Sequence, residues 1–123
     1  MKSLVVSTSL ALLLACGSPT GTTSGELAVR AVAPVLELTN HSSAPVYVFS
    51  IDRAAAAYTD WGPCTNPTAC AAISAGATSS LPYSQIDAYS TSSTQAIVYW
   101  WHLVADGKDG YRVDSLRAVV TTL

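Results

Sequence analysis

The segment Gln95–Ala105 places the strongest constraint on the fold of this chain. Its two alternating sets of side chains are both dominated by apolar residues: Ile97, Tyr99, Trp101 and Leu103 in one, Ala96, Val98, Trp100 and Val104 in the other. Successive side chains of a β-strand point to opposite faces, and a strand that is apolar on both faces belongs inside a sheet. The pattern therefore predicts a central strand.

Turn signals and further strand patterns lie on both sides of this segment. Residues 106–110 contain two Asp and two Gly, and the chain then returns through 111–113 and 116–123, which predicts a long hairpin. Upstream, Leu36 and Leu38 alternate with Val35 and Glu37, as in a strand with one wet face. A polar turn follows, and after it a run of strand formers at 46–51. The two predicted strands form either a hairpin or a pair that crosses between sheets.

The remaining segments of the chain are short and punctuated by turn residues. Four alanines after Asp52 indicate a helical turn capped by that aspartate, or an irregular edge. Ala75 and Gly76 predict a turn, and Pro82 belongs at the end or edge of a strand. No segment of ten or more residues has a helical period, so this chain of 123 residues is expected to be one all-β domain, a sandwich or a barrel.

The stretch LELTNHSSAPVYVF, residues 36–49, resembles the first hairpin of immunoglobulin-like envelope domains, in which an Asn/Ser/Pro turn joins two strands. This resemblance implies a single small immunoglobulin-like antiparallel β-sandwich. It implies no activity, because a fold alone does not carry function.

The first 16 residues have the pattern of an export signal. Lys2 precedes an apolar run that ends at Ala15, and this run is shorter than the roughly 20 residues a membrane-crossing helix needs. The four residues 13–16, Leu-Leu-Ala-Cys, look like a bacterial lipobox, whose cysteine is diacylglycerol-modified after the preceding peptide is removed. The resemblance implies lipidation of Cys16. The alternative is an ordinary signal peptide, with Cys16 a free thiol or a disulfide partner.

A Gly/Ser/Thr/Pro-rich segment, residues 17–25, follows the cysteine and is typical of a flexible tether. We therefore expect a lipoprotein signal peptide at 1–15, the lipidated cysteine and tether at 16–30, and the β-sandwich at 31–123. The expected location is the bacterial cell envelope, with membrane attachment through Cys16. Gly17 stands where an aspartate would resemble an inner-membrane retention signal, so the outer membrane is favoured where the host has one.

The other two cysteines, Cys64 and Cys70, form an even pair in a chain expected to be exported. Pro63 and Pro67 indicate a looped segment that a bridge would pin, so the sequence predicts a structural disulfide. A metal or redox role and two free thiols are the alternatives.

Composition and motif searches narrow the function classes. Charged residues make up 11% of the chain with a net charge of −2, and the scattered cations form no basic stripe, which argues against nucleic-acid binding. The chain has no GxSxG, HExxH, phosphate-loop or CxxC motif. We expect no catalytic residues, metal ligands or cofactor. The competing hypothesis is an envelope enzyme or metal-handling protein that uses His41 or His102. A two-histidine metal site would need both brought together with an acid such as Asp106.

Two adjacent tryptophans raise the question of a binding surface. Trp100 and Trp101 must point to opposite faces of their strand, so one enters the core and the other covers the second face, a partner or a ligand. With Tyr99 they make a candidate ligand patch; alternatively, the second tryptophan packs beneath the Cys64 to Cys70 loop or Trp61. We expect a noncatalytic domain that binds an envelope protein or glycan. A structural envelope spacer, dependent on tether length, is a further alternative.

Overall fold

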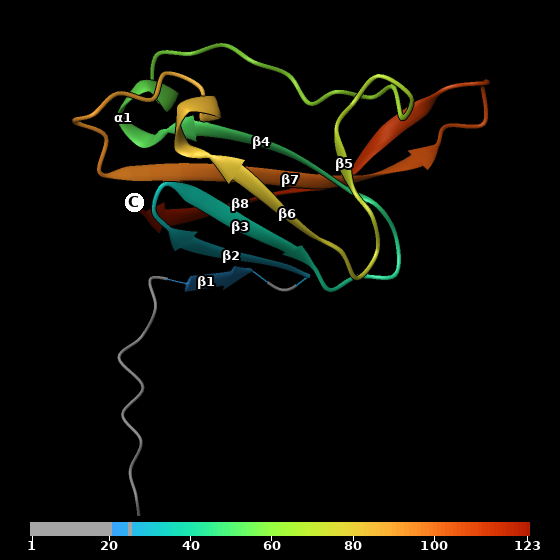
Figure 1. Cartoon of the computed structure of the whole chain (residues 1–123). Helices are drawn as coiled ribbons and strands as arrows, with labels where there is room; N and C mark the ends of the chain where they lie inside the picture. Colours follow the sequence, from blue (N-terminus) through green and yellow to red (C-terminus); the bar gives the residue numbers. More distant parts are fainter. Residues whose placement is uncertain (1–20, 25) are drawn as a thin grey trace, which may run out of the picture.

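The computed structural model describes residues 21–24 and 26–123, which form a sandwich of two antiparallel sheets (Figure 1). The first sheet has the order β1-β2-β3-β6, with β1 at Gly21–Ser24, β2 at Leu27–Val32, β3 at Val35–Asn40 and β6 at Thr78–Pro82. The second has the order β5-β4-β7-β8, with β5 at Ala72–Ile73, β4 at Val46–Asp52, β7 at Gln95–Ala105 and β8 at Tyr111–Thr122. The signal peptide and Cys16 lie outside the described residues.

The strand order from β2 onward is that of an immunoglobulin-like sandwich. In the strand letters of the immunoglobulin fold, the first sheet contains A, B and E, which are β2, β3 and β6 here. The second sheet contains C′, C, F and G, which are β5, β4, β7 and β8. The expected all-β antiparallel sandwich is thus confirmed. The chain crosses between the sheets where β3 leads into β4, so the sheet-crossing alternative for this pair is the correct one.

The predicted central strand and hairpin are also confirmed. Strand β7 lies between β4 and β8 and pairs with both in antiparallel register. The predicted helical turn is α1, Arg53–Ala56, and the Asp52 carboxylate caps it by accepting a hydrogen bond of 2.9 Å from the Ala55 amide. One further short element, a 3₁₀ turn, covers Tyr83–Gln85.

The boundary expected between tether and domain is wrong. Strands β1 and β2 occupy 21–24 and 27–32, so the sandwich reaches into the 16–30 segment that composition assigns to the tether. In β2, Leu27 and Val29 are fully buried, and the pairing Gly21↔Arg30 to Ser24↔Leu27 aligns β1 with them. Strand β1 is a Gly/Thr/Ser segment held through backbone pairing, so its composition contains no apolar alternation to mark it as a strand.

The core lies between the two sheets. It is built from the inward side chains of β2, β3, β4, β7 and β8, and its largest fully buried side chain is Trp100 of β7. The side chains of Leu36 and Leu38 are buried in it, as the alternation in β3 predicts. Close packing of both inner faces is the main stabilising contribution in a domain of this size.

Asn40 is the polar centre of the crossing from β3 to β4. Its side-chain amide donates to the carbonyl oxygens of Ala44 at 2.8 Å and Ile73 at 2.9 Å, and its Oδ1 accepts from the amide and the hydroxyl of Ser42. Its backbone amide donates to Ala77 and its backbone carbonyl accepts from Gly76. Every hydrogen-bonding position of this fully buried residue is therefore used, and one side chain joins three segments of the chain.

We predict that Asn40→Ala lowers the free energy of unfolding by about 3 kcal/mol, because it leaves buried carbonyl and amide groups without partners. Ser42→Ala is the matched control: it removes one partner at the exposed side of the same turn and costs about 1 kcal/mol. Urea denaturation followed by far-ultraviolet circular dichroism measures both losses. Equal losses for the two variants would contradict the central role of Asn40.

Candidate functional site

An aromatic cluster covers the outer face of the second sheet. Trp61, from the segment after α1, stacks on Phe49 of β4 with ring centroids 4.5 Å apart and lies 4.6 Å from Tyr99 of β7. The ring of Trp101 is 6.0 Å from Trp61, and its Nε1 donates a 3.0 Å hydrogen bond to the Cys64 carbonyl oxygen. The loop that contains the cysteines is therefore fastened over this face of the sheet.

The candidate patch of Trp100, Trp101 and Tyr99 does not form an open ligand surface. Trp100 is 0% exposed within the core, and Trp101 is 2% exposed beneath the Cys64 to Cys70 loop. Tyr99 is half-buried by Trp61. The alternative prediction, in which the second tryptophan, Trp101, packs under the loop, is correct. Trp61 adds to this cover through its long-range contact with the sheet.

The predicted disulfide between Cys64 and Cys70 is confirmed, with Cα atoms 5.9 Å apart. Within the ring that it closes, Asn66 accepts hydrogen bonds from the amides of Ala69 and Cys70 through its carbonyl oxygen, and its side chain accepts from Thr68. The bridge and these turns fix the position of the Cys64 carbonyl, which is the acceptor for Trp101.

We predict that the double variant Cys64→Ser, Cys70→Ser lowers the free energy of unfolding by about 2 kcal/mol, because the unfolded chain loses a short covalent ring. The released loop exposes Trp101, so the tryptophan emission maximum of the folded variant shifts to longer wavelength. Fluorescence and urea titration measure these effects. Thr65→Ser, a change in the same loop that keeps the bridge, serves as the control, and an unshifted emission maximum in the double variant would contradict the fastening role of the disulfide.

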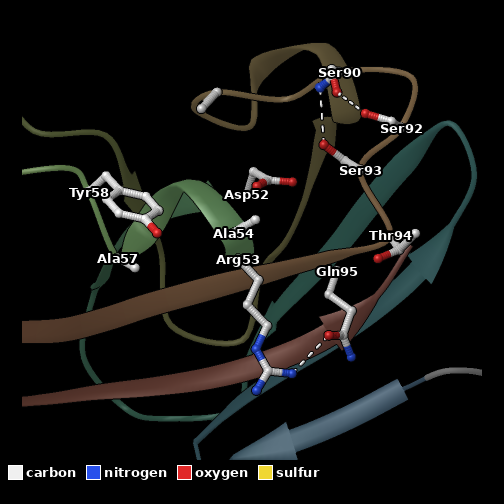
Figure 2. A pocket seen from close by; sticks show the side chains of 11 residues that line it. Asp52, Arg53, Ala54, Ala57, Tyr58, Ser90, Ser92, Ser93, Thr94 and Gln95 are labelled. Carbon is white, nitrogen blue, oxygen red and sulfur yellow. Dashed lines mark hydrogen bonds between the residues drawn. The ribbon is translucent and has the colours of Figure 1, made fainter.

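A polar pocket opens at the end of the sandwich where α1, the loop before β7 and the first residues of β7 meet (Figure 2). It has a volume of about 560 Å³ and is open to solvent. Its lining consists of Asp52, Arg53, Ala54, Ala57, Tyr58, Ala88, Ser90, Ser92, Ser93, Thr94 and Gln95. We call this feature the polar pocket.

The polar pocket combines an acidic group, a basic group and an exposed ring. The Ser93 hydroxyl, followed by the Ala55 backbone amide, holds the pKa of the Asp52 carboxyl below its ordinary value, so the group is ionised at neutral pH. Arg53 donates from Nη1 to Gln95 Oε1 at 2.8 Å, as Figure 2 shows. The Tyr58 side chain is 91% exposed. A hydrogen-bond acceptor, a donor and an aromatic ring therefore all belong to the lining of this pocket.

Sequence reasoning did not identify the polar pocket. Asp52 was expected only as a helix cap, and the serines at 90, 92 and 93 have the composition of an ordinary loop. The pocket exists because the isolated bridge Ile51↔Asp87 and the hydrogen bond from the Asp52 amide to Asp87 bring that loop beside the end of β4. Such contacts join residues far apart in the chain and leave no local pattern.

A second cleft lies between the disulfide loop and the tip of the β7–β8 hairpin. Its lining includes Asn66, Asp106, Asp109 and Tyr111. The Asp106 carboxylate accepts hydrogen bonds from the Lys108 and Gly110 amides, so it stabilises the hairpin turn. The expected turn at residues 106–110 is confirmed.

The two histidines do not form a metal centre with Asp106. His102 contacts Pro45 and Glu26 through its ring, whereas His41 reaches Glu26 only through its backbone amide. Among residues 21–24 and 26–123, no three His, Cys, Asp or Glu side chains gather closely enough to hold a metal ion. Within the same described part of the chain, none of the helices has the length and apolar character required to cross a membrane.

Comparisons with protein-family models, with curated protein sequences and with solved structures find no match to this chain. The fold and the chemistry of its surfaces are therefore the basis for a functional proposal.

Proposed function

We propose that this protein is a lipid-anchored, noncatalytic binding domain of the bacterial cell envelope, and that the polar pocket takes a glycan. The observation that carries the binding role is the arrangement in that pocket of an ionised carboxylate, a guanidinium group and an exposed tyrosine ring. The proposed location in the cell envelope rests on the lipobox-like sequence at Cys16.

The cysteine pairing supports the proposed location in the cell envelope. A disulfide between Cys64 and Cys70 is typical of proteins exported to an oxidising compartment. It uses two of the three cysteines in the chain, and Cys16 is the one that remains. A diacylglycerol group on that thiol contributes about 0.8 kcal/mol for each buried CH₂, and two or more acyl chains hold a protein stably at a membrane.

The chemistry of the polar pocket supports a polyhydroxylated ligand. Asp52 accepts and Arg53 donates hydrogen bonds, so neighbouring sugar hydroxyls find both kinds of partner. Tyr58 offers an aromatic face for the apolar side of a sugar ring. The volume of about 560 Å³ lies within the range of small-ligand sites, and the open rim leaves room for a glycan to extend beyond it.

The placement of His102 supports a noncatalytic role. A histidine that acts as a general base needs a ring nitrogen within reach of a nucleophile or of a proton on the substrate. Both ring nitrogens of His102 are engaged by Pro45 and Glu26, at the end of β4 that lies away from Asp52 and the polar pocket.

Lipidation of Cys16 is testable in a bacterial host. We expect the mature protein to enter the detergent phase of Triton X-114, to carry a fatty acyl mass at its amino terminus, and to accumulate as an uncleaved precursor under globomycin. The Cys16→Ser variant loses the acyl mass, while the Cys64→Ser, Cys70→Ser control keeps it. Native protein that stays in the aqueous phase without an acyl mass would refute the anchor.

Glycan binding is testable with the full chain on an array of bacterial cell-surface glycans, followed by calorimetric titration of those retained. We predict that Tyr58→Ala and Arg53→Ala each weaken binding about tenfold, because each removes one stacking or charge-assisted contact. Tyr111→Ala, which removes another exposed ring outside the polar pocket, leaves the affinity unchanged. Absence of any retained glycan, or an equal loss in the Tyr111 variant, would overturn the assignment.

A further inference from the structure

His102 joins three parts of the fold at the end of the sandwich nearest Asn40. It lies on β7, its Nδ1 is 2.8 Å from the carbonyl oxygen of Pro45, which directly precedes β4, and its Nε2 is 2.6 Å from Oε2 of Glu26. Glu26 belongs to the turn between β1 and β2 of the opposite sheet. The imidazole therefore links the first hairpin of one sheet to the central strand of the other.

The two partners of His102 determine which protonation state makes both contacts. A carbonyl oxygen only accepts hydrogen bonds, and an ionised carboxylate also only accepts, so both ring nitrogens must donate. Only the imidazolium form has two N–H groups. Loss of one proton places a nitrogen lone pair against an oxygen lone pair at one of these two short contacts, which converts an attraction into a repulsion.

The surroundings of His102 contain further charged groups. On β8, Asp114 is the pairing partner of His102. The Arg117 guanidinium, also on β8, lies 4.9 Å from the centroid of the Trp100 ring. The plane of that ring is perpendicular to the imidazole of His102. On the other side, β4 contributes Tyr47, which stacks on Trp101 at the outer face. Glu26 is the only one of the groups named here in direct contact with the ring, so it dominates the local electrostatics.

The contact between Glu26 and His102 holds the β1–β2 turn in place. Glu26 is also fixed through its backbone carbonyl, which accepts a 2.7 Å hydrogen bond from the His41 amide next to Asn40. The side chains of His102 and Glu26 are 17% and 44% exposed, so water and protons reach the pair while its hydrogen bonds remain partly shielded from solvent. A change at the imidazole is therefore transmitted to the turn through Glu26.

We propose that His102, Glu26 and Pro45 form a proton-dependent clamp that locks the β1–β2 turn onto the second sheet. Imidazole is the side chain whose charge changes between about pH 5 and pH 8. The stabilisation by the clamp is present while both ring nitrogens carry a proton and Glu26 is ionised, and it is lost when the ring gives up one of these protons. This inference concerns the described fold and does not depend on the lipid anchor or on glycan binding.

Amide hydrogen exchange of the full chain in detergent, at pH 5.5 and pH 8.5 and corrected for intrinsic rates, tests the clamp. We expect protection of the His41 and Leu27 amides to fall about tenfold at the higher pH, while amides at the centre of β7 keep theirs. The ¹⁵N resonances of the His102 ring should show both nitrogens protonated at pH 5.5. Equal protection at both pH values, or a neutral ring at pH 5.5, would overturn the proposal.

Two variants separate the clamp from a general effect of pH. Glu26→Gln places a carboxamide opposite Nε2 of His102. Its oxygen accepts from a protonated Nε2 and its NH₂ group donates to an unprotonated one, so we expect protection to become independent of pH. His41→Asn removes the other imidazole and keeps the full pH effect. A pH effect that persists in Glu26→Gln or disappears in His41→Asn would refute the assignment to His102.

Discussion

The fold depends on the saturation of Asn40 by hydrogen bonds. The crossing from β3 to β4 takes the chain from one sheet to the other, and such a crossing buries backbone groups that no strand partner satisfies. The side chain of Asn40 donates to the Ala44 carbonyl in this crossing and to the Ile73 carbonyl of β5, and its backbone pairs with Gly76 and Ala77 in the segment between β5 and β6. Asn40 thereby ties the start of the crossing to β5 and to the segment between β5 and β6.

The start of β4 determines which side chains reach each face of the second sheet. In the register of β4 with β7, Val48 pairs with Trp100 and Phe49 with Tyr99, so the pairs alternate between the core and the outer face. The outer rings would lie more open to solvent if the segment between α1 and the disulfide loop did not bring Trp61 against Phe49 and Tyr99. The loop thus acts as a third layer over part of the sheet, and the bridge compensates for the small core of a short domain.

Local patterns predicted the elements that bury side chains, and long-range contacts determined the rest. The alternation in Val35–Asn40 and the apolar faces of Gln95–Ala105 specified β3 and β7, and the Asp52 cap specified α1. Strand β1 escaped prediction because backbone pairing alone defines it. The sequence could place Trp100 and Trp101 on opposite faces but could not choose between a ligand patch and cover by the Cys64 to Cys70 loop or Trp61, since Trp61 is 40 positions from Trp101. The polar pocket was missed for the same reason.

The polar pocket and the His102 clamp lie at opposite ends of β4. This strand has seven residues, which separates its ends by roughly 20 Å at about 3.3 Å per residue. Their hydrogen bonds are separate: the Asp52 carboxylate accepts from the Ala55 amide of α1, and His102 contacts Glu26 in the β1–β2 turn. Under the two proposed roles, loosening of that turn leaves the hydrogen bonds of Asp52 and Arg53 unchanged, so a response to pH at one end does not alter the proposed ligand site at the other.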